Sequence, residues 1–197
     1  MKHNYTLALG LMCLVFFGFT SYTSFNHKIE IAKLEKKIDN IQLETKEVQL
    51  TRMIVELQPA IEHNTLVEYK EAITEASKKW KISPILLAAV VFRESSFKQY
   101  SKGTKLPSGN RCIGPMQIHP VIHKDKLDER GLKKDHLYDI AVNVDVGTEI
   151  LKSYLVKYDY NVKRALYHYV GGKSPNYVMD IVNWYVQYDA KMLSIII

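Results

Sequence analysis

The chain has 197 residues, of which 47% are hydrophobic and 24% charged, so it holds enough apolar side chains for one globular core and is not a disordered protein. Its two cysteines, Cys13 and Cys112, cannot form a disulfide framework. The 27 Lys and Arg residues outnumber the 21 Asp and Glu residues, and the whole surplus of +6 lies from Lys81 onward. A basic globular face favours an anionic polymer or a membrane surface as partner, and charge alone leaves nucleic acid, wall polymer and lipid open.

The first predicted element is a membrane anchor. The run from Tyr5 to Phe25 contains no charged residue, and about 20 predominantly apolar residues are enough to cross a bilayer as a helix. A cleaved signal peptide is the alternative, because Lys2 precedes the strongest apolar stretch, but no Ala-x-Ala-like cleavage site follows it. We therefore assign residues 1–27 to a retained N-terminal transmembrane anchor.

Residues 28–58 are predicted to form a helical stalk. Positions at alternating three- and four-residue spacings define a coiled-coil-like seam there. These positions are Ile31, Leu34, Ile38, Ile41, Thr45, Val48, Arg52 and Val55. Because Thr45 and Arg52 weaken the seam, a single helical stalk and a dimerising coiled coil, which would make a homo-oligomer, both stay open. Pro59 is expected to end the helix, since proline lacks a backbone donor and disfavours helical geometry in the residue before it.

Residues 59–197 are predicted to form one all-α globular domain. Ser83 and Pro84 are typical of a helix start, and the helix that follows, Ile85–Phe92, is apolar on all sides, which predicts a buried central helix. Further helices are expected over Asp139–Tyr158, Val162–Tyr169 and Tyr177–Met192. The Gly- and Pro-rich segment from Ser95 to Leu137 is irregular, and such segments often carry binding residues on a rigid scaffold.

A single carboxylate, Glu94, follows the all-apolar helix directly. Apolar surroundings disfavour its ionised form, and the negative end of the helix dipole acts in the same direction, so we expect the pKa of Glu94 to be raised toward neutrality. A carboxyl group with such a pKa suits a general acid at physiological pH. The alternative is that Glu94 pairs with Arg93 or caps loop amides at the surface.

Four short motifs in order resemble those of the soluble lytic transglycosylase (SLT) domain family, over roughly Glu75 to Tyr188. The motifs are Glu94-Ser95, Gly114-Pro115-Met116-Gln117-Ile118, the set Asp139, Asn143 and Gly147, and the stretch Ala165-Leu166-Tyr167-His168-Tyr169-Val170-Gly171-Gly172. The sequence departs from the family pattern at Pro115, Ile140 and Val170. The resemblance implies a lysozyme-like fold that cleaves the glycan of bacterial peptidoglycan.

The same resemblance implies the roles of individual residues. Glu94 would be the catalytic acid that protonates the oxygen between MurNAc and GlcNAc and then takes the proton of the C6 hydroxyl, giving a 1,6-anhydro end. The substrate-binding residues would be Ser95, Met116, Gln117, Asn143 and Tyr169, with Tyr169 hydrogen-bonded to Glu94 through its hydroxyl. Neither a metal nor another cofactor is implied, and we predict peptidoglycan rather than nucleic acid as partner.

Two other functions stay open. A goose-type muramidase would use water and would need a further carboxylate, for which Asp125 and Asp139 are candidates. A membrane-tethered glycan-binding module without catalysis is the other. The anchor predicts a single-pass protein of the inner membrane with its domain in the periplasm, or a virion-associated protein if it comes from a phage. Such tethering would suit localised wall opening by a secretion apparatus or during phage entry.

Overall fold

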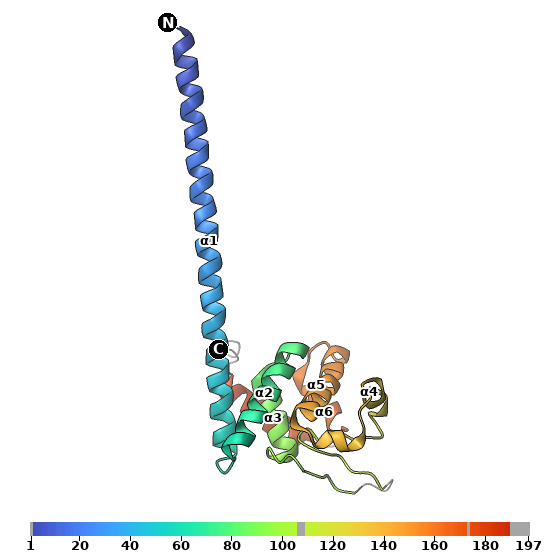
Figure 1. Ribbon diagram of the computed structural model, residues 1–197. Coiled ribbons are helices and arrows are strands. Elements are labelled where there is room, and N and C mark those ends of the chain that lie inside the picture. Colours follow the sequence, from blue (N-terminus) through green and yellow to red (C-terminus); the bar gives the residue numbers. More distant parts are fainter. Residues whose placement is uncertain (1, 106–108, 173, 190–197) are drawn as a thin grey trace. The chain divides into compact units, whose positions relative to one another are not determined.

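The computed structural model describes residues 2–105, 109–172 and 174–189, and within them all side chains except those of residues 2–26, 41, 43 and 44. The chain divides into two compact units, Met1–Thr45 and Lys46–Ile197 (Figure 1). One helix, α1 (Lys2–Leu57), begins in the first unit and ends in the second. It ends just before Gln58 and Pro59.

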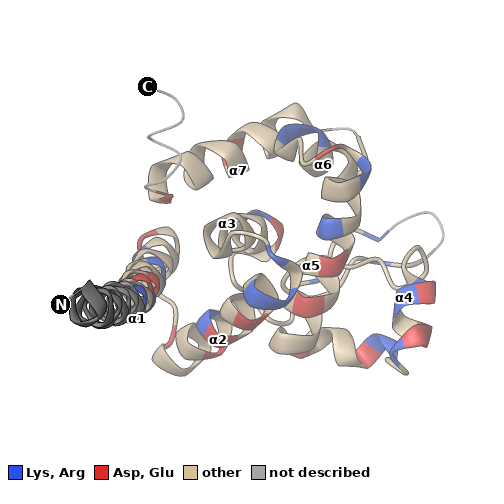
Figure 2. Cartoon of the chain, turned by 90° about the horizontal axis from the view of Figure 1, so that it is seen from above, with Lys and Arg blue, Asp and Glu red and all other residues tan. Residues whose placement is uncertain are grey.

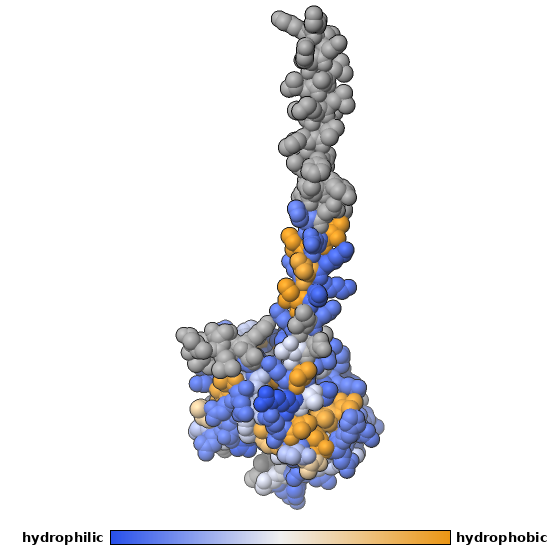
Figure 3. Space-filling view, turned by 90° about the vertical axis from the view of Figure 1, so that its left-hand side faces the viewer, coloured by the Kyte–Doolittle hydropathy of each residue, from blue (hydrophilic) through white to orange (hydrophobic). Residues whose placement is uncertain are grey.

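In the first unit, the described residues 2–45 are helical throughout. The predicted membrane-spanning run, Tyr5–Phe25, lies in the part of α1 whose side chains are outside the described ones. Among the residues that are described, none of the helices has a stretch long and apolar enough to span a bilayer. Farther along α1, apolar side chains stand in solvent, as Figure 3 shows, with Ile31, Leu34 and Ile38 each more than half exposed.

The second unit is mainly helical, as predicted. After α1 it contains α2 (His63–Trp80), α3 (Pro84–Ser95), α4 (Lys124–Glu129), the 3-10 helix η1 (Lys134–Tyr138), α5 (Ile140–Lys157), α6 (Val162–Tyr169) and α7 (Pro175–Tyr188). In the described part of the chain, extended pairing is limited to two isolated antiparallel bridges, Lys102 with Ile113 and Ile113 with Ile118. These bridges shape the irregular segment between α3 and α4.

Helix α3 is the centre of this unit, and the prediction of a buried central helix is confirmed. Every residue from Ile85 to Val91 is buried, because this segment has no polar face. Helices α2, α5, α6 and α7 lie around α3 in Figure 2, and each neighbouring pair of these four, apart from α2 and α7, is in contact. Such an enclosure fixes the end of α3, and therefore Glu94, on a rigid scaffold.

The last turns of α1 belong to the same core. Leu50, Met53 and Ile54 are buried almost completely and belong to the same hydrophobic cluster as the α3 side chains. The compact unit therefore begins at Lys46, ahead of the boundary that the sequence suggested at Pro59. The reason is physical: a three-and-four spacing of apolar residues serves a coiled-coil seam and a domain core equally well.

Two helix ends differ in detail from the sequence expectation. Ser83 stands at the N-cap of α3, but its hydroxyl donates to Asp189 Oδ2 at 3.1 Å instead of capping the helix. Helix α7 begins at Pro175, two residues before the predicted start, and ends at Tyr188. The predicted continuation to Met192 falls outside the described residues.

An ion-pair network fastens α2 and the end of α4 to α5. Asp145 accepts hydrogen bonds from Lys79 Nζ (2.7 Å) and Trp80 Nε1 (2.7 Å), and it pairs with Arg130, which also pairs with Glu149. Partial burial opposes ionisation of Asp145, but the hydrogen bonds from Lys79 and Trp80 and the charge of Arg130 outweigh it and lower the pKa of its carboxyl group.

Candidate active site

Glu94 lies in the last turn of α3, where the chain turns sharply. The two residues after this helix, Ser96 and Phe97, both adopt left-handed backbone angles, with φ of 50° and 57°. This conformation is unfavourable for residues with a Cβ. Two contacts hold it: the Phe97 ring is buried at 5.1 Å from the ring of Tyr69, and the side-chain amide of Gln58 donates to the Ser96 carbonyl oxygen at 3.1 Å. The turn lets the loop leave the core while Glu94 stays against it.

The electrostatics of Glu94 agree with the sequence expectation. Burial raises the pKa of its carboxyl group to about 7, and a hydrogen bond from Tyr177 and the charge of Arg93 oppose that rise only in part. The Arg93 charge is shared, because its Nε donates to Asp180 Oδ2 at 3.0 Å. A substantial fraction of Glu94 therefore holds its proton near pH 7, as a general acid requires.

The tyrosine that contacts Glu94 is not the one predicted. Tyr177 Oη donates to Glu94 Oε1 at 2.5 Å, whereas Tyr169 Oη donates to the Met116 carbonyl oxygen at 2.9 Å. The prediction of a Tyr169–Glu94 hydrogen bond is therefore wrong in this structure. Tyr169 still lies near the acid, since burial and then the Glu94 charge raise its pKa well above the ordinary value. No sequence signal separated Tyr177 from the other tyrosines, because its role depends on where α7 packs.

Asn143 organises the 113–118 loop. It is fully buried in α5, and its Oδ1 accepts from the Met116 backbone N–H at 2.7 Å. Its Nδ2 donates to the carbonyl oxygens of Ile113 (3.0 Å) and Leu137 (2.7 Å). Because a buried amide needs hydrogen-bond partners, these three bonds give Asn143 a structural role: they hold the loop against α5. Its direct contact with substrate stays a prediction.

Two glycines allow the 113–118 loop and α5 to approach each other closely. A Cβ at Gly114 would stand 2.3 Å from Asn143 Nδ2, and the φ of this glycine is +76°. A Cβ at Gly147, one turn after Asn143, would stand 2.7 Å from Met116 Cβ. Asp139 caps the same helix by accepting from the Val142 N–H at 2.9 Å. The four-residue spacing of Asp139, Asn143 and Gly147 places all three residues on one face of α5. Asp139 caps the helix, Asn143 holds the loop, and Gly147 leaves room for the Met116 side chain.

The remaining predicted site residues hold the local structure. Ser95 is buried and donates to the Val91 carbonyl oxygen at 3.0 Å, within its own helix. Met116 is fully buried against α5. The half-buried Gln117 has a φ of 49°, and its Nε2 donates to the Gly114 carbonyl oxygen at 2.8 Å. Substrate contacts of Ser95, Met116 and Gln117 stay predictions.

The groups that act on Glu94 suit acid catalysis by one carboxyl group. Within the described part of the chain, Tyr177 and Arg93 are the side chains that influence the pKa of Glu94, and no second carboxylate does so. Asp139, a muramidase candidate, is engaged as the cap of α5, and Asp125 lies exposed in α4. Among the residues described, no three or more His, Cys, Asp or Glu side chains are grouped so as to hold a metal ion.

Three comparisons relate the chain to known proteins. The profile of the family described as the transglycosylase SLT domain matches residues 71–178. The membrane-bound lytic murein transglycosylase E of Buchnera aphidicola subsp. Acyrthosiphon pisum (strain APS) is 31% identical over 105 residues. That alignment covers 51% of this chain and 45% of the relative, so the chain matches less than half of the length of this relative.

Among solved structures, an inactive mutant of the lytic transglycosylase Slt from Pseudomonas aeruginosa is similar with a TM-score of 0.52 and 16% sequence identity. The similarity covers 64% of this chain and 24% of that protein, and it supports the fold. The family profile covers more than half of the chain, including Glu94, the 113–118 loop and the Asn143 face of α5. The chain therefore belongs to the transglycosylase SLT domain family.

Proposed function

We propose that this protein is a peptidoglycan lytic transglycosylase and that Glu94 is its catalytic acid. The observation that carries the proposal is a lone, half-buried carboxyl group whose pKa is raised to about 7 at the end of a buried helix. Family membership and the curated relative, whose name describes a lytic murein transglycosylase, support the choice of substrate. We further propose that the bond cleaved is the β-1,4 bond between MurNAc and GlcNAc.

The reaction needs one carboxyl group in two roles. Protonated Glu94 gives its proton to the glycosidic oxygen as the bond from that oxygen to C1 breaks, and positive charge develops on the MurNAc ring. The Glu94 carboxylate then accepts the proton of the C6 hydroxyl as its oxygen bonds to C1, which closes the 1,6-anhydro ring. No water enters the product. The hydrogen bond from Tyr177 stabilises the carboxylate between the two steps.

The test is mass spectrometry of the muropeptides that the full chain, in detergent, releases from purified peptidoglycan. We expect products with 1,6-anhydro ends from the wild-type chain and at least a 100-fold loss of release with Glu94→Gln, as is typical when a general acid is removed. Glu75→Gln is the matched control, because Glu75 is an exposed residue of α2 that pairs with Lys78. Its products are expected to equal those of the wild type.

The two other functions are separate outcomes of the same experiment. Reducing ends, heavier than anhydro ends by one water, identify a hydrolytic muramidase. Binding of peptidoglycan without release by the wild-type chain identifies a tethered glycan-binding module. Either result contradicts the transglycosylase proposal. The absence of a second carboxylate among the described groups that act on Glu94 favours the transglycosylase over the muramidase.

We also propose that the protein is tethered to the membrane. The uncharged run Tyr5–Phe25 supports an anchor, and the curated relative is named as membrane-bound. The proposed arrangement is a single-pass inner-membrane protein with a stalk and a periplasmic domain, or a virion-associated protein, that opens the wall locally for secretion or phage entry. Fractionation tests it: the full chain stays in the membrane pellet after a high-salt wash, and recovery in the wash would refute the tether.

A further inference from the structure

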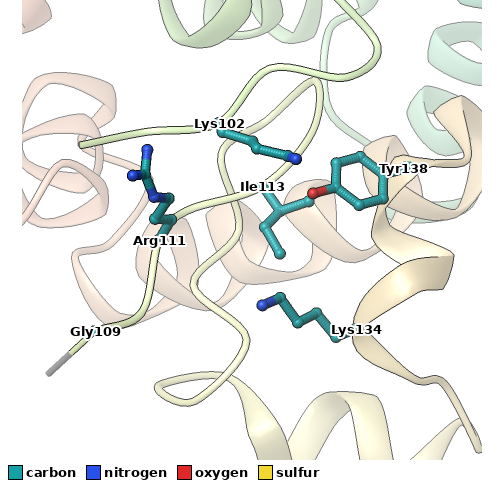
Figure 4. A pocket seen from close by; sticks show the side chains of 6 residues that line it. All are labelled: Lys102, Gly109, Arg111, Ile113, Lys134 and Tyr138. Atoms are coloured by element: carbon teal, nitrogen blue, oxygen red, sulfur yellow. The ribbon is translucent and has the colours of Figure 1, made fainter. Parts of the chain in front are cut away.

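A cationic pocket lies between the loop after α3 and the 3-10 helix η1. It encloses about 430 Å³, within the range of pockets that bind small ligands. Its lining consists of Lys102, Gly109, Arg111, Ile113, Lys134 and Tyr138. In Figure 4, Lys102 and Lys134 reach toward the pocket from opposite sides of Ile113, and Tyr138 stands beside them. Three of the six lining residues are cations, and none is an acid.

The three cations of this pocket are exposed side chains, as are several other cations of the domain. Within the described structure, Lys79, Lys126 and Arg130 are paired with Asp145 or Glu149, whereas no ion pair joins Lys102, Arg111 or Lys134 to a carboxylate. The Lys102 ammonium lies 5.6 Å from the centre of the Tyr138 ring. Like charges gathered without counter-charge raise the electrostatic potential and attract an anion.

Backbone hydrogen bonds hold the wall of the pocket, which lies on the loop after α3. Lys102 and Ile113 form an antiparallel bridge, and the Gly103 N–H donates to the Cys112 carbonyl oxygen at 3.0 Å. Cys112 lies between two lining residues, and burial and then the Glu94 charge raise the pKa of its thiol. The pocket wall therefore belongs to the loop that leaves α3 directly after Glu94.

We propose that this pocket is a carboxylate-binding subsite for the peptide that a peptidoglycan glycan strand carries, an inference that rests on the proposed function. Lysine and arginine recognise carboxylates through charge-assisted hydrogen bonds. The partly exposed Tyr138 ring adds an apolar surface that suits the aliphatic parts of a peptide. Inorganic phosphate shares the anionic chemistry but has no such part, so the lining favours the peptide.

Turnover of two substrates tests the subsite. One is peptidoglycan strands that keep their peptides, and the other is the same strands after an amidase has removed the peptides. We expect the double variant Lys102→Gln/Lys134→Gln to raise KM for the peptide-bearing strands about tenfold, because two charge-assisted contacts are lost. For the peptide-free strands, KM is expected to change less than twofold. An equal change on both substrates, or no change on either, overturns the proposal.

Two control variants separate the subsite from general effects of charge and folding. Lys102→Arg/Lys134→Arg keeps both cations and is expected to retain the wild-type KM. Lys163→Gln removes an exposed cation of α6 outside the pocket. It is expected to leave the preference for peptide-bearing strands unchanged. If Lys163→Gln weakens that preference as strongly as the pocket variants do, net charge explains the effect and the subsite is refuted.

A binding measurement distinguishes failure of the subsite from failure of the proposed function. In the full chain with Glu94→Gln, we expect the Kd for peptide-bearing strands to be at least fivefold lower than for peptide-free strands, and this difference to vanish in the double variant. Inorganic phosphate at millimolar concentration is the competing probe, and phosphate binding without a preference for peptide overturns the proposal. If wild-type chain yields no anhydro ends while the preference persists, the proposed function fails and the subsite stands.

Discussion

At the scale of single residues, the hydrogen bond between Tyr177 and Glu94 sets the balance between acid and carboxylate. Burial raises the pKa of Glu94 to about 7, and the Tyr177 hydroxyl lowers it by donating to the charged form. The proposed reaction requires one carboxyl group to donate a proton and then to accept one, and a pKa near neutrality serves both steps.

Tyr177→Phe is therefore expected to shift the pH dependence of kcat. Without the donor, the pKa of Glu94 rises further, so the alkaline limb of the pH profile moves to higher pH by about one unit. The value of kcat at neutral pH falls, because the carboxylate that must accept the C6 proton is less stable. Tyr167→Phe, at an exposed tyrosine of α6, is the control. An alkaline limb that stays in place or moves to lower pH contradicts this role of Tyr177.

The raised pKa of Glu94 also predicts a cost in stability. Between pH 4.5 and about 7, the folded state binds the Glu94 proton more tightly than the unfolded state does. The free energy of unfolding therefore falls as pH rises through this window and levels off above it. Glu94→Gln removes this dependence, so its stability relative to wild type is expected to be greater at pH 8 than at pH 4, by about 3 kcal/mol at most. Denaturant unfolding of both chains at the two pH values measures it, and a gain that is larger at pH 4 would have the wrong sign.

At the scale of the elements, the last turns of α1 are part of the domain. Leu50, Met53 and Ile54 are each at most 1% exposed. Full burial of such a side chain contributes roughly 1.5–3 kcal/mol. Tyr188 of α7 adds a hydrogen bond to Glu56 at 2.6 Å. A domain cut at the end of this helix loses all of these contacts.

Truncation tests the contribution of α1. A chain beginning at Lys46 is expected to unfold cooperatively, and one beginning at Pro59 is expected to lose several kcal/mol of unfolding free energy. Thermal denaturation followed by circular dichroism measures both. Equal stability of the two chains would mean that the three buried side chains of α1 are dispensable. A substitution at the exposed Val48, which leaves the core intact, is expected to change the stability of the longer chain little.

The elements also show what the sequence is able to predict. The run Ile85–Phe92, apolar on all sides, predicted the buried helix α3, since burial follows directly from such a pattern, and the order of the motifs predicted the role of Glu94. Tyr177 was missed because its partner is set by the packing of α7, which no local pattern records. The start of the compact unit was missed because a coiled-coil seam and a core-facing helix share one spacing.

At the scale of the whole molecule, the open question is whether α1 joins two copies of the chain. Its seam positions Ile31, Leu34, Ile38, Val48 and Val55 are 43–62% exposed. Apolar side chains repeated at heptad spacing are stable in water when a second helix covers them. Under the proposed function, a dimer would also bring two SLT domains to one point of the wall. We therefore predict that the full chain is dimeric through the stalk.

Sedimentation equilibrium of the full chain in mild detergent tests this prediction. The wild-type chain is expected to have twice the monomer mass at micromolar concentration. Leu34→Glu/Ile38→Glu places negative charges at facing seam positions of the two helices, and this repulsion is expected to give monomers. Lys36→Glu is the matched control, because position 36 lies on the face of the helix away from the seam, and its dimer is expected to persist. A wild-type chain that is monomeric at these concentrations would assign α1 to a single-helix stalk, and a dimer that survives the double substitution would place the contact elsewhere in the chain.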